Sequence, residues 1–249
     1  MLLSSPLQNA LPIKTMKNPL ALFLLSMILI SCGNDFRVKG TISSDVINGE
    51  YVYIKRVQNG VTHTIDSCKV QHGAFEMSGN ADSVYITSLY IGNVPILPFV
   101  AEKGNIELQI TDNAVIVSGT PLNDELNALI RKQAALEERM AQFERLETSL
   151  ILNGSSAEAA ADCVSDSIAA VGAAVEALMN SYVRRNFDNV LGPCIFALMY
   201  SAVPAPILDD KLNALYNDAP PSFRNDAFVK SFYDVARENA ARLQQMRLQ

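Results

Sequence analysis

The hydrophobic and polar positions of the chain follow two different periods, which meet near residue 119. In residues 36–119, apolar and polar residues alternate, as in Phe36-Arg37-Val38-Lys39, and turn residues such as Asn59-Gly60 separate the runs. Side chains of a strand point alternately to its two faces, so the pattern predicts about eight short strands. No helical period interrupts them. Short strands at this spacing favour an antiparallel sandwich or open barrel.

The rest of the chain has the period of α-helices. Thr120-Pro121 predicts a helix start, because Thr caps helices and Pro is favoured at their first position. A four–three spacing then predicts a seam along a partner helix; its positions are Leu122, Leu126, Leu129, Gln133, Leu136, Met140, Phe143, Glu147 and Leu150. After Asn153-Gly154 an Ala-rich helix runs to about residue 185, and helices follow near 190–203, 207–217 and 225–247. A dimer interface is the alternative use of the seam.

The chain is therefore expected to be an α+β protein. An N-terminal antiparallel β-sandwich or open barrel over residues 32–119 is followed by an all-helical domain over residues 120–249, which contains a long antiparallel helical hairpin. The 249 residues carry a formal net charge of −6 and no cluster of basic residues. Nucleic-acid binding depends on such clusters, so we expect no nucleic-acid partner.

The N-terminal residues 1–31 have the features of a secretory signal peptide. Lys14 and Lys17 precede the apolar run NPLALFLLSMILIS at residues 18–31, which ends in the small residue Ser31. A membrane-spanning helix needs roughly 20 apolar residues, and this run is shorter. Met16 is the alternative start to Met1, because signal peptides carry their positive charge near the N-terminus.

The four residues that end this segment, Leu29-Ile30-Ser31-Cys32, resemble the lipobox of bacterial lipoproteins. The resemblance implies that a signal peptidase recognises Leu29, Ile30 and Ser31 and cuts before Cys32. It also implies that Cys32 receives acyl chains such as palmitate. Several acyl chains anchor a protein stably, whereas one chain binds a membrane only marginally. We therefore expect a cell-envelope protein that is bound to the membrane through Cys32.

Several short motifs resemble those of Bacteroidetes lipoproteins that carry a DUF4369 domain. They are Phe36-x-Val38-x-Gly40, Gly73-Ala74-Phe75, Pro98-Phe99-Val100-x-x-Lys103-Gly104-Asn105-Ile106, Val117-Ser118-Gly119-Thr120-Pro121-Leu122-Asn123, Asn186-x-Asp188-Asn189-Val190-Leu191-Gly192 and Pro220-Pro221-Ser222-Phe223. In many such proteins a thioredoxin-like thiol–disulfide oxidoreductase domain follows. This sequence stops where that domain would begin and has no Trp and no Cys-x-x-Cys, so the resemblance implies fold and compartment but not redox activity.

The same resemblance bears on the location in the envelope. In Bacteroidetes lipoproteins an acidic run after the lipidated cysteine is associated with export to the cell surface. Here only Asp35 is acidic, which favours the outer membrane with the protein facing the periplasm. Exposure on the cell surface is the alternative.

The cysteines and histidines suggest no catalytic or metal centre. Gly192-Pro193-Cys194 matches part of a Cys-Gly-Pro-Cys redox motif, but Leu191 stands where the attacking cysteine would be. Cys163 and Cys194 are candidates for a disulfide in an oxidising compartment, with free buried cysteines as the alternative. His63, Cys68 and His72 offer zinc ligands, yet residues 63 and 68 would point to opposite faces of a strand.

The remaining candidates concern acids and tyrosines. The paired acids Asp209-Asp210, Glu137-Glu138 and Asp162/Asp166 suit helix surfaces, and no spacing places two carboxylates across a cleft. Aromatic residues on the expected strands could form a binding surface, with ordinary packing as the alternative; they are Tyr51, Tyr53, Tyr85 and Tyr90. We expect no catalytic residue, metal or cofactor.

The function that follows is a non-catalytic binding or scaffolding lipoprotein of the envelope, with a protein or small-molecule partner. The alternative function is an accessory or docking component of a periplasmic thiol–disulfide exchange system, without its own Cys-x-x-Cys centre. This alternative depends only on the resemblance to the longer lipoproteins.

Overall fold

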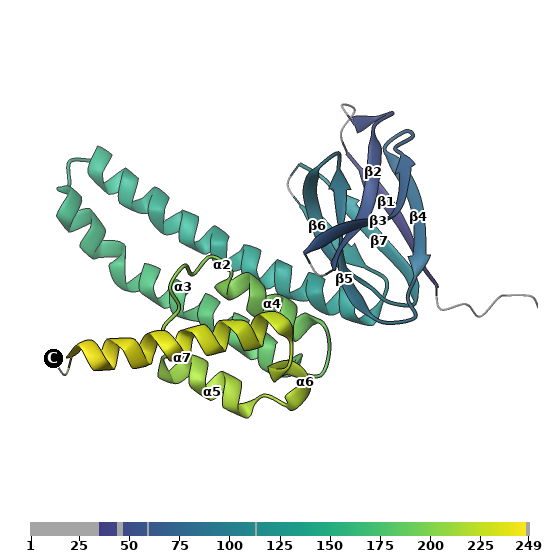
Figure 1. Ribbon diagram of the computed structural model, residues 1–249. Coiled ribbons are helices and arrows are strands. Elements are labelled where there is room, and N and C mark those ends of the chain that lie inside the picture. The colour runs from purple at the N-terminus through teal and green to yellow at the C-terminus, as the bar shows by residue number, and fades with distance from the viewer. Residues whose placement is uncertain (1–34, 44–46, 59, 113, 248–249) are drawn as a thin grey trace, which may run out of the picture. The chain divides into compact units, whose positions relative to one another are not determined.

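A computed structural model describes residues 35–43, 47–58, 60–112 and 114–247 (Figure 1). The helices and strands below belong to one compact unit. The expected signal peptide, its recognition residues Leu29, Ile30 and Ser31, and the anchor Cys32 lie outside the described residues. In the part of the chain that is described, no helix is long and apolar enough to cross a membrane.

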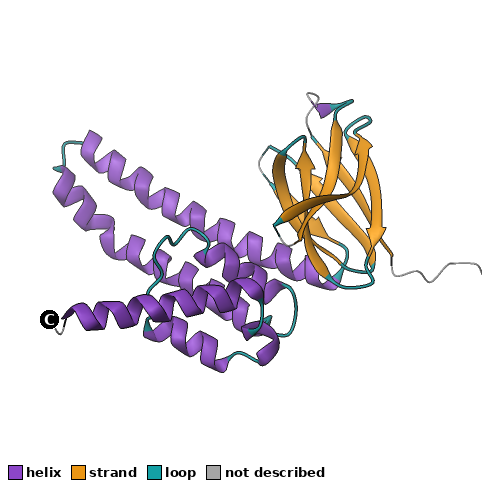
Figure 2. Ribbon diagram, in the orientation of Figure 1, coloured by secondary structure: helices purple, strands orange, loops and turns teal. Residues whose placement is uncertain are grey.

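Two four-stranded sheets form the N-terminal half, drawn in orange in Figure 2. The first has the order β4-β1-β7-β8, with β4 (Ala74–Asn80), β1 (Asp35–Ile42), β7 (Gly104–Ile110) and β8 (Val115–Ser118). The second has the order β3-β2-β5-β6, with β3 (Val61–Lys69), β2 (Tyr51–Gln58), β5 (Tyr85–Ile91) and β6 (Val94–Ala101). This confirms the predicted sandwich, and the sheets do not close into a barrel.

One strand pair departs from the predicted antiparallel pattern. β1 and β7 are parallel neighbours, with Val38 opposite Ile106, while the other pairs in both sheets are antiparallel. Parallel neighbours need a long crossover connection. Here the connection from β1 to β7 includes the whole second sheet, so periodicity within either strand could not reveal the pairing.

The core lies between the inner faces of the two sheets. In β1 every second residue is buried, as the alternation predicts, and the ring of Phe36 packs edge-on against that of Phe99 at 6.4 Å between centroids. Gly40 leaves the space that the ring of Phe75 occupies, because a Cβ there would lie 1.8 Å from that ring. Gly40 of the first motif is therefore a packing residue.

Two long helices, α2 (Pro121–Leu152) and α3 (Ala157–Arg185), form the predicted antiparallel hairpin. None of the nine predicted seam positions is exposed: Leu126 and Leu129 are buried, and the others are partly buried. α2 contacts α3 of the same chain, and it also contacts β6 and β8. The seam is therefore used within the molecule, as the short Asn153-Gly154 connection suggests.

Four shorter helices complete the fold: α4 (Leu191–Tyr200), α5 (Asp210–Asp218), α6 (Pro221–Arg224) and α7 (Ala227–Arg247). They agree with the predicted helices within a few residues, except that the short α6 was not expected. Pro221 begins it, at a position where Pro is favoured. Together the sandwich and the helices confirm the α+β class.

Candidate functional site

Hydrogen bonds at the first turn of α2 join the sandwich to the helices. Asn123 is completely buried; its Oδ1 accepts from the backbone N–H of Val100 at 2.8 Å. Its Nδ2 donates to the carbonyl of Val100 at 2.8 Å and to Oγ1 of Thr120 at 2.7 Å. Oε1 of Glu102 accepts from the amides of Leu122 at 2.8 Å and Asn123 at 3.2 Å. These bonds hold the start of α2 against the end of β6.

The capping of α2 differs from the sequence prediction. Thr120 stands at the predicted N-cap, but its hydroxyl makes no capping bond to a helix amide. Glu102 supplies that acceptor from outside the helix, which local sequence cannot show. Gly119 is required at this junction: its φ is +98°, and a Cβ would lie 2.4 Å from the carbonyl oxygen of Asn105.

A second polar cluster fixes the start of α4. Asn186 is buried, and its Nδ2 donates to Oε1 of Glu125 on α2 at 2.8 Å. Asn189 donates to Oδ1 of Asn186 at 2.7 Å and accepts from the amide of Leu191 at 2.9 Å. A Cβ at Gly192 would lie 2.3 Å from the carbonyl of Asn186. The motif from Asn186 to Gly192 therefore positions α4.

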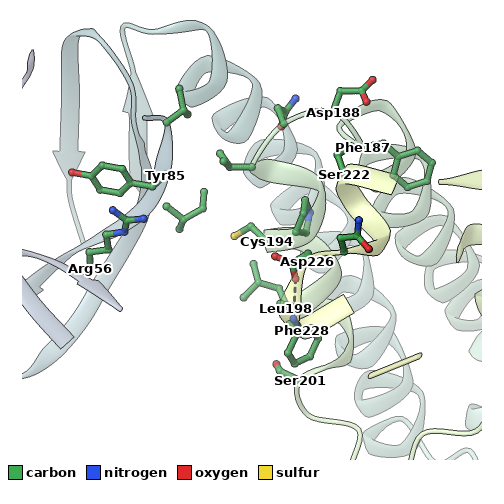
Figure 3. Close-up of a pocket in the computed structure, with 17 residues that line it drawn as sticks. Arg56, Tyr85, Phe187, Asp188, Cys194, Leu198, Ser201, Ser222, Asp226 and Phe228 are labelled. Atoms are coloured by element: carbon green, nitrogen blue, oxygen red, sulfur yellow. Dashed lines mark hydrogen bonds between the residues drawn. The ribbon is translucent and has the colours of Figure 1, made fainter. Parts of the chain in front are cut away.

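A cleft of about 880 Å³ lies between β2 and β5 on one side and α4, α6 and α7 on the other (Figure 3). The sheet side is lined by Arg56, Val84, Tyr85 and Ile86. The helical side is lined by Phe187, Asp188, Asn189, Val190, Pro193, Cys194, Ala197, Leu198, Ser201, Ser222, Asn225, Asp226 and Phe228. Small-molecule sites are typically clefts of roughly 300–1,000 Å³.

Three apolar side chains of this cleft are open to solvent. Leu198 is 58% exposed, Val84 43% and Phe228 36%. Exposed apolar side chains that gather in one concave place mark interaction sites more often than scattered ones do. The cleft therefore offers contact surface on both of its sides.

The charged groups of the cleft are divided between its two sides. On the sheet side, the guanidinium carbon of Arg56 lies 4.0 Å from the centroid of the Tyr85 ring, whose hydroxyl donates to the carbonyl of Asn80 at 3.0 Å. Burial raises the pKa of Tyr85, so its hydroxyl stays a donor at neutral pH. On the helical side, Oδ1 of Asp226 accepts from the amides of Phe228 and Val229 at the start of α7.

The two cysteines proposed as a disulfide are not brought together. Both are free, with Cys163 exposed on α3 and Cys194 partly buried on α4. Cys163 lies near the start of α3 and α4 follows its end, so about 33 Å of helix separates them at 1.5 Å per residue. A disulfide needs Cα atoms within about 7 Å. The pair is not formed in this structure.

Cys194 lines the cleft, but its environment does not favour reaction. Burial raises the pKa of its thiol to about 11. The thiolate is the reactive form, so at neutral pH the group is almost entirely the unreactive thiol. Cys194 therefore acts as part of the helical surface of the cleft.

The other sequence candidates lie elsewhere. His63 and Cys68 are on β3, and His72 follows in a turn with φ of 52°. Within the described ranges, no three His, Cys, Asp or Glu side chains form a group that could hold a metal ion. Of the paired acids, Asp209 caps α5 by accepting from the amide of Leu212 at 2.7 Å.

The four candidate tyrosines separate into two places. Tyr51, Tyr53 and Tyr90 lie on the outer face of the second sheet, since the alternate residues of β2 are buried and Tyr53 pairs with Tyr90. Nζ of Lys55 lies 4.8 Å from the ring centroids of both Tyr53 and Tyr90. Tyr85 is instead in the cleft, beside Arg56.

Sequence reasoning missed the cleft residues Arg56, Leu198 and Phe228. No local signal marks them, because residues of β2, α4 and α7 become neighbours only in the folded chain. The motifs that hold the cleft in shape were visible, at residues 117–123 and 186–192.

Comparison with known proteins gives one match. Neither the curated proteins nor the solved structures contain a match to this chain. Residues 36–126 match the family described as a domain of unknown function, DUF4369. The match runs from β1 through β8 and past Asn123 into α2, so it includes the hydrogen-bonded junction. The sandwich and the first turns of α2 are a DUF4369 domain.

Proposed function

We propose that this protein is a lipid-anchored lipoprotein of the cell envelope whose folded part is a non-catalytic binding module. Its binding site is the cleft between β2–β5 and α4–α7. The observation that carries this proposal is the presence of exposed apolar side chains on both sides of that cleft, on Val84, Leu198 and Phe228.

The expected anchor has a consequence for placement. Only two residues separate Cys32 from Asp35, where β1 begins, so the three steps between them span at most about 11 Å. Phe36 pairs with Gly104, at the end of the sandwich from which the chain passes into α2. An acylated Cys32 would therefore hold this end of the sandwich close to the membrane, which we propose is the outer membrane on its periplasmic side.

The alternative function, an accessory in thiol–disulfide exchange, receives no support from Cys194. Its thiol is protonated at neutral pH because burial raises its pKa to about 11, and Cys163 lies far from it along α3. In this alternative the protein would supply a docking surface, and the Cys-x-x-Cys centre would lie on another chain.

The anchor is tested by the intact mass of the protein extracted from its native membrane. We expect the mass of residues 32–249 plus acyl groups. Cys32→Ser should abolish the acylation and the cut before residue 32, because the sulfur that receives the lipid is lost. Cys163→Ser is the matched control, since Cys163 is an exposed side chain on α3, and should keep the wild-type modification. An unacylated wild-type chain that retains residues 1–31 would contradict the anchor.

Binding in the cleft is tested with a neutral apolar probe, N-phenyl-1-naphthylamine, which accepts energy from tryptophan. The chain has no Trp, so Val203→Trp places a single reporter beside the cleft; Val203 is exposed, does not line the cleft and lies two residues from Ser201, which does. In the full chain reconstituted into lipid vesicles, we expect saturable quenching of this reporter. Adding Val84→Glu, a charge on the opposite side of the cleft, should weaken the quenching about tenfold, which corresponds to about 1.4 kcal/mol.

The matched control for Val84→Glu is Val61→Glu. Val61 is also an exposed strand valine, at 55%, but it does not line the cleft. Val61→Glu should leave the quenching unchanged. Quenching by probe that is merely dissolved in the lipid should respond to neither substitution. Equal effects of the two substitutions, or no saturable quenching, would show that the cleft does not bind apolar ligands.

A further inference from the structure

We infer that the cleft selects small ligands with an apolar body and one anionic group, and that Arg56 binds the anion. This inference rests on the proposed binding function of the cleft and adds the chemical class of the ligand. It follows from the state of Arg56, from the apolar side chains around it and from the position of the acids.

Arg56 carries a charge that the described residues do not neutralise. Other arginines form ion pairs, Arg145 with Glu138 and Arg184 with Asp218, but no carboxylate in the described ranges forms one with Arg56. Its guanidinium lies over the ring of Tyr85 at 4.0 Å instead. A stacked guanidinium keeps the N–H donors at its edge available, and their fork matches a carboxylate or sulfonate.

Arg56 is also held in place before any ligand arrives. The hydroxyl of Tyr85 donates to the carbonyl of Asn80, which restrains the ring on which Arg56 lies. The oxygen of the adjacent Lys55 backbone accepts from Oγ1 of the buried Thr87 at 2.8 Å. A pre-organised cation loses less conformational freedom on binding than a free surface side chain does.

Apolar surface lies next to this cation. Val84 and Ile86 flank Tyr85 on the sheet side, and Leu198 and Phe228 line the helical side. In Figure 3 the Arg56 side chain lies on the sheet side and Leu198 faces it across the cleft. A ligand whose anion reaches Arg56 can therefore place an apolar body against side chains from both sides.

The two acids of the cleft reinforce this orientation. Asp188 and Asp226 both lie on the helical side, away from Arg56 (Figure 3). Oδ1 of Asp226 already accepts from two amides at the start of α7, at 3.0 and 3.1 Å. Like charges repel, so an anionic group is disfavoured near these acids and favoured at Arg56.

The test compares two probes that share one ring system. 8-Anilinonaphthalene-1-sulfonate has the apolar body of N-phenyl-1-naphthylamine plus a sulfonate. Both are titrated against the full chain carrying Val203→Trp in zwitterionic lipid vesicles. We expect Arg56→Gln to raise the dissociation constant of the sulfonate about tenfold and to change that of the neutral probe less than about twofold. Arg56→Lys keeps the charge and should retain most of the sulfonate binding.

The matched control is Arg37→Gln, because Arg37 is an exposed arginine on β1 that lies outside the cleft. This substitution should leave the dissociation constants of both probes unchanged. If Arg56→Gln weakened the binding of both probes equally, Arg56 would contribute only packing against the apolar body of the ligand, and the inference would be overturned. Binding of the neutral probe with no effect of Arg56→Gln on the sulfonate would overturn it as well, while the proposed function stands. Failure of both probes would overturn the proposed function itself.

Discussion

Replacing Phe196 by alanine is expected to lower the free energy of unfolding by about 3–5 kcal/mol. Phe196 is 1% exposed and lies at the centre of the helical core. Its ring centroid lies 4.7 Å from that of Tyr200, 5.7 Å from those of Phe223 and Phe232, and 6.2 Å from that of Phe228. Removing the ring leaves a cavity among four other rings, which belong to three helices. These helices cannot all move inward to fill the cavity. The loss is measured by urea unfolding of the full chain, followed by circular dichroism.

Val235→Ala on α7 is the matched control for this substitution. Val235 is also an apolar residue of the helical region but is 44% exposed, so its truncation opens no cavity. We expect a change within about 0.5 kcal/mol. If Phe196→Ala destabilised the protein no more than this control, the aromatic cluster would not be a central part of the core.

Replacing Asn123 by alanine is expected to cost about 3 kcal/mol, because an unsatisfied buried polar group costs about 1–3 kcal/mol. Asn123 is completely buried, and its side-chain amide forms hydrogen bonds with both the N–H and the carbonyl of Val100. Alanine would leave both backbone groups without a partner at the junction between β6 and α2. The stability is measured by the same urea unfolding.

Gln142→Ala serves as the control on the same helix. Gln142 is exposed, and its side chain makes one weak hydrogen bond, to Glu138 at 3.4 Å. Alanine also favours helices, so we expect little change. Equal stabilities of the two variants would mean that the junction does not depend on the Asn123 amide.

Much of the fold could be predicted because each element carries its own period. The alternation in β1 places Phe36 and Val38 inside, and the four–three spacing of α2 places Leu126 and Leu129 toward the rest of the molecule. Such periods are set by the geometry of a single strand or helix. The lipobox at Cys32 is also a local signal and stays a prediction that the intact mass would test.

The candidate site could not be predicted in the same way. Arg56 and Leu198 lie on elements that are far apart in the sequence, and neither belongs to a motif. Their exposure depends on what the neighbouring elements leave uncovered. Tyr85 and Cys194 were candidates from the sequence, and Asn123 and Asn186, which position α2 and α4, belong to its motifs, but none of these signals indicated that a cleft forms.

The sequence by itself therefore determined the strands, the helices other than the short α6, the α+β order and the helical hairpin, because these follow from local periodicity and turn chemistry. The tertiary structure alone decided the parallel pairing of β1 with β7, the capping of α2 by Glu102 and the cleft around Arg56. Each of these joins residues that are distant along the chain. Whether such residues come into contact depends on how whole elements pack against one another. The hydrophobic period of a single element contains no information about that packing.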